Sequence, residues 1–216
     1  MPRRRLAWDC ATGNGQAARD LARYFDRVVA TDASPEQVAH AVPAANVEYR
    51  VAAAESSGLE AGSTDLVTVA QALHWFVRES FFDEVRRVAV PGGILAAWSY
   101  GWCHAGSDVE SLLRGFEDGT VGPYWNPERR WVVERYRTIP IPFEEVPAPT
   151  FELRAEWTLS QLGAYLSSWS AVSNYRQKHG DDPVPPVLER IAKYWGRPDR
   201  TREITWPLNI RVGRVG

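Results

Sequence analysis

The chain is poor in cysteine, and this limits its chemistry. Of 216 residues only Cys10 and Cys103 are cysteines, and they lie far apart in the sequence. Such usage argues against a disulfide framework, and no histidine or carboxylate stands at a spacing that would complete a metal site around either thiol. We therefore expect no disulfide bond, no metal ion and a cytoplasmic location.

Lysine is equally scarce, since it occurs only at Lys178 and Lys193, and nearly all basic charge is arginine. The formal net charge of −2 gives no electrostatic reason to expect a nucleic acid or an anionic membrane as partner. No apolar run approaches the roughly 20 residues of a membrane span, and no apolar segment follows the basic residues 1–5 as in a secretory signal. We expect a monomer or homodimer with neither nucleic acid nor membrane as partner.

The first hundred residues alternate between two kinds of hydrophobic periodicity. Strands are predicted at 6–9, 27–31, 47–51, 65–70 and 94–100, and helices at 16–25, from Ser34-Pro35 onward, and at 81–88. This alternation is typical of βαβ units and predicts an α/β fold with a doubly wound, mostly parallel sheet. Ligands of such sheets bind at the carboxyl ends of the strands.

The second half differs, because it holds most of the tryptophans and two proline clusters. It predicts a strand at 151–157, helices at 159–178 and 187–195, and a last strand from Glu203 to Val212. Pro207 inside that strand predicts an edge position or a bulge, because proline has no N–H to donate.

A glycine-bearing turn, Thr12-Gly-Asn-Gly15, follows the first strand. Gly13 and Gly15 allow the backbone to approach a ligand, and the following helix offers free N–H groups. The same glycine spacing, with Asp32 further on, fits a dinucleotide site, and a tight turn without any ligand is a third interpretation. Asp9 favours a cationic ligand over a dinucleotide, because a carboxylate at this point repels a pyrophosphate.

Two further carboxylates fit a nucleoside without phosphate. Asp32 ends the second strand and can accept both ribose hydroxyls, although it can also cap the helix that begins at Ser34-Pro35. Glu55 follows the third strand and can accept the adenine amino group, or it is a solvated loop charge.

Several segments together resemble the motifs of class I methyltransferases, which use S-adenosyl-L-methionine. They are Asp9-x-Ala11-x-Gly13-x-Gly15, Thr31-Asp32-Ala33-Ser34, Ala54-Glu55 and Val69-Ala-Gln71-Ala-Leu-His74-Trp75-Phe76, of which the last is the most specific. The similarity covers nearly the whole chain. It is to the methyltransferase type 11 group, which includes trans-aconitate methyltransferase-like and juvenile-hormone-acid-methyltransferase-like enzymes. It implies a Rossmann-like, seven-stranded sheet whose last strand is antiparallel beside strand five.

The motifs name the expected cofactor-binding residues: Asp9, Ala11, Gly13, Gly15, Asp32, Ala33, Ala54, Glu55 and Gln71. We expect one methyltransferase domain over 1–216, with 1–100 as the cofactor-binding half and 101–216 as the acceptor-side half. The family pattern has glycine at the position of Ala11, a difference that a negative φ would tolerate. Family members also carry a helix and an aromatic segment before the first strand, which close over the cofactor. We expect this lid to be lacking, since the first predicted strand begins at Leu6.

The candidate catalytic residues, Gln71, His74 and Trp75, follow the fourth strand. Methyl transfer from a sulfonium is an in-line displacement, so the protein mainly orients the acceptor and excludes water. A carboxylate acceptor is already ionised at neutral pH and needs only donors, which Gln71 and the indole N–H of Trp75 can provide. His74 is a general base for a hydroxyl or amine acceptor, or a helix-start residue bonded to backbone. We therefore expect methylation of the carboxylate of a small organic acid.

Other residues of the second half are weaker candidates for acceptor binding. Arg129, Arg130 and Arg176 are candidate carboxylate clamps, and Tyr100, Trp102, Tyr124, Trp125, Trp131 and Trp169 form either an acceptor pocket or a plain core. An NAD(P)-dependent oxidoreductase is one alternative, but the two late lysines leave no Tyr-x-x-x-Lys pair. A degenerate, non-enzymatic S-adenosylmethionine-binding protein is a second. A nucleic-acid methyltransferase is a third, which the charge and the lack of an Asn-Pro-Pro-Tyr-like motif disfavour.

Overall fold

A computed structural model describes residues 4–76, 78–197 and 199–216. The chain forms two compact units, the first built from Met1–Ser99, Trp131–Thr150 and Asn209–Gly216, and the second from Tyr100–Arg130 and Phe151–Leu208. Each unit has hydrophobic clusters of its own. That residues 1–216 act as one methyltransferase domain stays a prediction.

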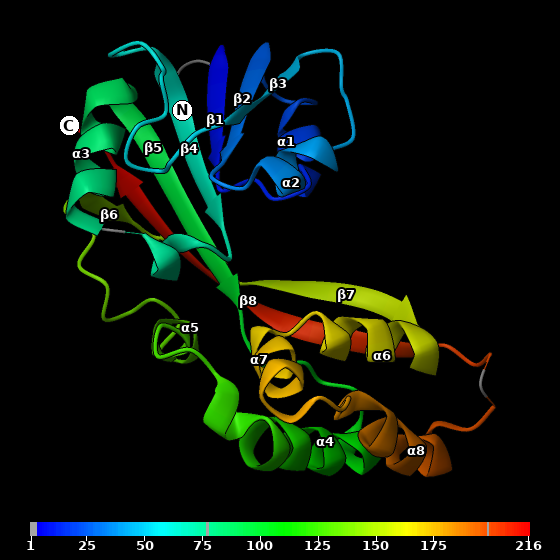
Figure 1. Cartoon of the computed structure of the whole chain (residues 1–216). Coiled ribbons are helices and arrows are strands. Elements are labelled where there is room, and N and C mark those ends of the chain that lie inside the picture. The colour runs from blue at the N-terminus through cyan, green and yellow to red at the C-terminus, as the bar shows by residue number, and fades with distance from the viewer. Residues whose placement is uncertain (1–3, 77, 198) are drawn as a thin grey trace. The chain divides into compact units, whose positions relative to one another are not determined.

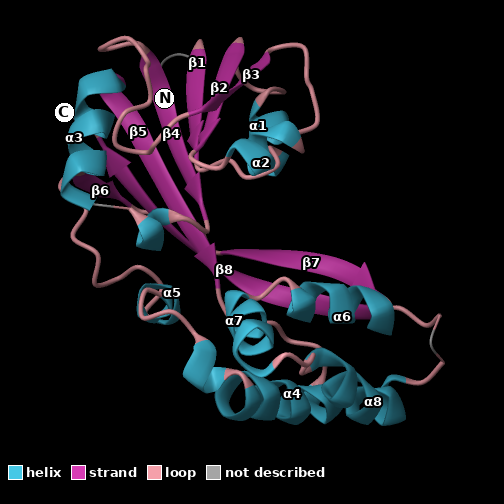
Figure 2. Cartoon of the chain, viewed as in Figure 1, coloured by secondary structure: helices cyan, strands magenta, loops and turns pink. Residues whose placement is uncertain are grey.

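The first unit alternates strands and helices as predicted (Figures 1 and 2). Its elements are β1 (Leu6–Cys10), α1 (Gln16–Leu21), β2 (Arg27–Asp32), α2 (Pro35–Ala39), β3 (Val47–Val51), β4 (Thr64–Ala70), the 3₁₀ turn η1 (Leu73–Trp75), α3 (Arg78–Val88), β5 (Ala89–Tyr100), β6 (Glu144–Val146) and the end of β8 (Arg202–Arg214). The short helix α5 (Arg129–Val133) begins in the second unit and ends in the first. The strand order is β3-β2-β1-β4-β5-β8-β6.

Strand directions confirm the predicted sheet. β3, β2, β1, β4 and β5 pair in parallel, and β6 pairs antiparallel with β8. Val215 N–H donates to the Gly93 carbonyl and Gly101 N–H donates to the Pro207 carbonyl, so β8 runs antiparallel to β5. The fold is therefore α/β, mostly parallel, with the last strand antiparallel, and β7 (Phe151–Trp157) adds a strand beside β8.

Alternation of side chains along the strands explains why helices cover both faces of this sheet. One set packs with α3 in a cluster that contains Trp8, Val29, Val67, Leu95, Phe81 and Val85. The intervening residues pack with α1 in a second cluster that contains Ala7, Val28, Ala30, Leu66, Ala18 and Phe25. In Figure 1, α3 accordingly lies at one side of these strands and α1 and α2 at the other.

The second unit is mainly helical. It holds α4 (Ser107–Arg114), a π-helical turn η2 (Gly115–Thr120), the 3₁₀ turn η3 (Gly122–Tyr124), α6 (Leu159–Ser167), α7 (Ser170–His179), α8 (Val184–Trp195), β7 and the beginning of β8. The single helix predicted at 159–178 is two helices. The chain leaves helical geometry at Trp169 (φ −68°, ψ 134°), and the Ser168 hydroxyl donates to the Tyr165 carbonyl at 2.7 Å.

Pro207 is not at a sheet edge, contrary to one predicted alternative, and its pairing with β7 runs without the bulge that was the other. It lies opposite Glu152 of β7, and its carbonyl accepts the Gly101 N–H on its other side at 3.2 Å. Because proline has no N–H, β8 lacks one backbone hydrogen bond at this position, but the strand continues through it. Among the described residues, no helix is long and apolar enough to cross a membrane.

Candidate active site

A cleft of about 540 Å³ opens in the first unit at the carboxyl ends of β1 to β4. The residues that line it come from the turns that follow these strands and from α2: Ala11, Gly13, Asp32, Ala33, Gln37, Ala52, Ala53, Ala54, Glu55, Ala70, Gln71, Ala72, Trp75 and Phe76. Its two charged groups are carboxylates, and none of these lining residues is a lysine or arginine. Such a cleft suits a cationic or neutral ligand better than a pyrophosphate.

The turn after β1 contains two glycines with different structural roles. Gly13 has a φ of +58° and lines the cleft, and a Cβ built on it would meet only Gln37 Oε1, at 3.8 Å. Gly15, at a φ of +85°, caps α1 and does not line the cleft. A Cβ on Gly15 would clash with the Tyr49 ring, so the left-handed φ and the packing of Tyr49 both favour glycine here. The predicted cofactor role therefore has geometric support at Gly13 and none at Gly15.

Asp32 joins the glycine turn to the end of β2. Its Oδ2 accepts the Gly13 N–H and its Oδ1 accepts the Ser34 N–H, both at 2.9 Å. Each carboxylate oxygen keeps a second acceptor position, which suits the two hydroxyls of a ribose. The helix cap is Ser34, whose Oγ accepts the Gln37 N–H at 3.3 Å, so the alternative role of Asp32 as that cap is wrong.

Asp9 lies behind the cleft rather than in it. The side chain is fully buried and accepts hydrogen bonds from the hydroxyls of Thr12 at 2.6 Å and Thr68 at 2.7 Å. Burial raises the pKa of Asp9, and the two hydroxyl bonds oppose that rise. Because Asp9 is not among the lining residues, the structure supports an anchoring role for it beneath the turn rather than direct contact with a ligand.

Two lining residues hold left-handed backbone conformations. Ala11 and Gln71 both have a φ of +54°, and they follow β1 and β4 respectively. The negative φ that would have made alanine a neutral replacement for glycine at position 11 is therefore absent. Strained backbone of this kind concentrates at functional sites, where the surrounding fold maintains it. Its presence on two sides of one cleft supports a binding role for this cleft.

The three candidate catalytic residues separate in the structure. Gln71 and Trp75 line the cleft, and Trp75 is 52% exposed. His74 lies in η1 but is buried, 7% exposed and outside the lining set, with its Nδ1 2.8 Å from the hydroxyl of Tyr136. One partner of His74 is thus the side chain of Tyr136.

Sequence reasoning identified most of the cleft and missed part of its wall. Ala11, Gly13, Asp32, Ala33, Ala54, Glu55 and Gln71 line it as predicted for the cofactor. Gln37, Ala52, Ala53, Ala70, Ala72 and Phe76 also line it and were not predicted. Most of the missed residues lie within the motifs or beside them, so too few residues of each motif were chosen as lining residues. Gln37 carries no signal in the sequence. Glu55 is half-buried and lines the cleft, which supports a binding role over a solvated loop charge.

The second-unit arginines are committed to other contacts. Arg129 pairs with Glu117 and stacks 3.6 Å from the Trp125 ring centroid, and Arg176 pairs with Asp182 at 2.7 Å. Tyr100, Trp102, Tyr124, Trp125 and Trp169 pack against the core of the second unit, whereas Trp131 packs in the first. These arginines and rings have structural roles on their own units, which weakens the case for them as clamps and pocket wall. In the described residues, no group of three or more His, Cys, Asp or Glu side chains could hold a metal ion.

The donor set of the cleft fits S-adenosylmethionine. A carboxylate at the end of β2 suits a ribose, the alanine-rich turns after β3 and β4 give a narrow apolar wall for an adenine, and the absence of cationic lining suits a sulfonium and an ammonium. When bound, this cofactor supplies an electrophilic methyl group. The residues of the chain bind it and keep water away from the transfer.

Comparisons with known proteins agree with this site. Residues 8–97 match the methyltransferase domain family. A methyltransferase of Dictyostelium discoideum is 35% identical over 200 residues, which are 91% of this chain and 76% of the relative. The structure of a type II methyltransferase from Anaeromyxobacter dehalogenans superimposes with a TM-score of 0.91 at 40% identity and covers 99% of this chain and 91% of that one. The chain therefore belongs to the class I methyltransferase family and uses S-adenosylmethionine as its methyl donor.

Proposed function

We propose that the chain transfers the methyl group of S-adenosylmethionine to a carboxylate oxygen of a small organic acid. The proposal depends chiefly on one observation: the donors Gln71 and Trp75 line the cleft, whereas His74 is buried against Tyr136. A hydroxyl or amine acceptor needs a base near the transferred methyl, and the histidine that would serve is turned to another partner. A carboxylate needs only hydrogen-bond donors.

In the proposed reaction each residue has a separate role. Asp32 holds the ribose, Glu55 accepts the adenine amino group, and Gly13 lets the backbone lie close to the ligand. Gln71 and Trp75 would orient the acceptor carboxylate towards the bound cofactor. The cofactor would supply its methyl group to one carboxylate oxygen, and the acceptor would give up no proton, because it is already ionised. The products are a methyl ester and S-adenosylhomocysteine.

An acceptor screen with methyl-labelled cofactor tests the proposal. Small carboxylic acids, amines, phenols and thiols are incubated separately with the chain, and the product is then treated with alkali. A methyl ester releases its label as volatile methanol, whereas N-, S- and ether-linked methyl groups are stable. We expect alkali-labile label from carboxylic acids. Label found only on amines or thiols contradicts the proposed acceptor, and cofactor binding without transfer to any class indicates a non-enzymatic binder.

A further inference from the structure

The loop between β3 and β4 forms one wall of the cleft, although it contains no helix or strand. Residues 52–55 line the cleft, and residues 52–63 belong to neither a helix nor a strand. Two backbone bonds anchor its beginning: Ala52 N–H donates to the Asp32 carbonyl at 3.0 Å and Ser56 N–H to the Ala53 carbonyl at 3.1 Å. The contacts of the residues that follow Glu55 are a further constraint on its position.

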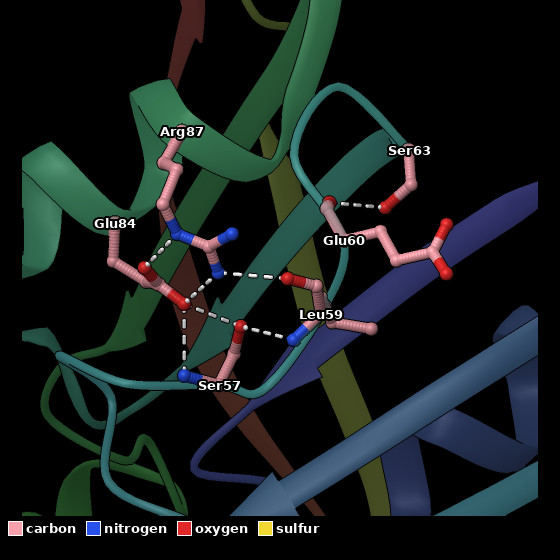
Figure 3. Close-up of polar contacts among 6 residues, drawn as sticks. All are labelled: Ser57, Leu59, Glu60, Ser63, Glu84 and Arg87. Carbon is pink, nitrogen blue, oxygen red and sulfur yellow. Dashed lines mark hydrogen bonds and ion pairs between the residues drawn. The ribbon is translucent and has the colours of Figure 1, made fainter.

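Two side chains of α3 fix those residues (Figure 3). The Ser57 N–H and hydroxyl both donate to Glu84 Oε1, at 2.8 and 2.5 Å, and the Leu59 N–H donates to Ser57 Oγ at 3.1 Å. Arg87 donates to both oxygens of Glu84 at 2.7 Å and to the Leu59 carbonyl at 2.8 Å. We call Ser57, Leu59, Glu84 and Arg87 the loop clamp.

The loop clamp is built around a buried charge. Glu84 is 7% exposed, and a carboxylate at that depth is tolerated only when it is paired and hydrogen-bonded. The two-fold bond from Arg87, helped by Ser57, lowers the pKa of Glu84 to about 2. The charge therefore persists at ordinary pH. Such bidentate pairs are also geometrically specific, so they fix an orientation as well as a distance.

We propose that Glu84 and Arg87 are positioning residues that determine nucleobase specificity through Glu55. By holding the chain at Ser57, two residues beyond Glu55, the loop clamp keeps the Glu55 carboxylate where it accepts the adenine amino group. Neither Glu84 nor Arg87 lines the cleft, so their effect on the ligand is indirect. This inference rests on the proposed role of Glu55 in cofactor binding.

A second buried carboxylate supplies a matched control. Asp65 is 3% exposed and accepts backbone N–H bonds from Arg5 at 2.9 Å and Leu6 at 3.1 Å. Leu6 begins β1, whereas the cleft lies beyond its other end. Loss of Asp65 should therefore destabilise the same unit without altering the loop after β3.

The test compares two ligands that differ only at the base. S-adenosylhomocysteine and S-inosylhomocysteine, which has an oxo group in place of the adenine amino group, are titrated calorimetrically into wild type, Glu84→Gln, Glu55→Gln and Asp65→Asn. We expect the wild type to prefer the adenine ligand and Glu84→Gln to lower that preference about tenfold, as the loss of one oriented hydrogen bond to a charged group can do. Asp65→Asn should lower the thermal midpoint and keep the preference. In the Glu55→Gln background, Glu84→Gln should no longer change the preference.

Each failure has a distinct meaning. A folded Glu84→Gln variant with wild-type preference for adenine overturns the proposal. A wild type that binds S-adenosylhomocysteine and its inosine analogue equally overturns the role of Glu55 and the inference with it. A wild type that binds neither contradicts the proposed function itself. If Glu84→Gln does not fold, Ser57→Ala replaces it in the comparison. This variant removes the hydroxyl bonds to Glu84 and to the Leu59 N–H and keeps the backbone bond from Ser57 to Glu84.

Discussion

Ala11 and Gln71 hold left-handed backbone conformations, which cost a non-glycine residue about 1–2 kcal/mol. Both residues line the same cleft, at the ends of β1 and β4. The sequence predicted both as cofactor residues but did not predict their backbone angles. Those angles depend on the direction in which β1 and β4 end and the following turns begin. At this scale the residue types were predictable and the strain was not.

Ala11→Gly should stabilise the protein. Glycine removes the steric penalty of a φ of +54° and returns part of it as extra freedom in the unfolded chain, so we expect a net gain of about 0.5–1 kcal/mol in the free energy of unfolding. Urea denaturation measures this gain. Ala39→Gly, at the exposed end of α2, is the control and should destabilise by about as much. A loss of stability in Ala11→Gly would show that the left-handed angle carries no strain.

The turn η1 is held by a segment far along the chain. Tyr136, which follows α5, is fully buried and bonds His74, while Arg211 of β8 donates to the carbonyl of Tyr136 at 2.5 Å. The sequence around Tyr136 shows no periodicity, and Tyr136 itself has a φ of +56°. No pattern in the sequence could therefore have paired it with a histidine 62 residues away.

Tyr136→Phe should weaken this element-level contact. The variant keeps the buried ring and removes the hydroxyl, so His74 loses a buried hydrogen-bond partner at an expected cost of about 1–3 kcal/mol in the free energy of unfolding. Thermal and urea unfolding check the loss. Tyr24→Phe is the control, because Tyr24 is 60% exposed and its hydroxyl is solvated. Equal stability of the two variants would mean that the bond contributes nothing.

Most strands were predictable, whereas the short strand β6 and the interruptions of the later helices were not. β3 and β7 have the predicted bounds, and β1, β2 and β4 each differ by one residue, because runs of β-branched and aromatic residues between turn residues define a strand well. β5 begins at Ala89, five residues before its predicted start. The break at Ser168 and Trp169 contains neither proline nor glycine, and the π-helical turn Gly115–Thr120 continues α4 with no local signal. Tertiary packing decided both features.

At the scale of the whole molecule, the chain enters each unit more than once. The predicted halves, 1–100 and 101–216, follow the sequence, but residues 131–150 and 209–216 return to the first unit. These returning segments contain a three-residue strand and a proline-rich stretch, so their hydrophobic pattern is too short to place them. The cleft, by contrast, is lined entirely by residues 11–76, and that is why local motifs found most of it.

The lowered pKa of Glu84 predicts that its contribution to the free energy of unfolding is lost at acid pH. That pKa is about 2 in the folded chain, against an ordinary 4.5, so the folded state binds this proton more weakly than the unfolded state. Its stabilising contribution is complete above pH 4.5 and is lost as the pH falls from 4.5 towards 2. The free energy of unfolding of the wild type should therefore exceed that of Glu84→Gln at neutral pH, and the difference should shrink through this window. A difference that does not change with pH would contradict the pairing of the buried Glu84 carboxylate with Arg87.

Glu48 is a control for Glu84, because it is also paired with arginine but is exposed. Bonds from Arg50 and Arg27 also lower the pKa of Glu48 to about 2, but its side chain is 44% exposed. Salt screens exposed pairs far more than buried ones, with a Debye length of about 3 Å at 1 M. Raising sodium chloride to about 1 M should therefore abolish the effect of Glu48→Gln on unfolding and leave most of the effect of Glu84→Gln. Equal loss of both effects would place Glu84 in solvent and remove the physical basis of the loop clamp.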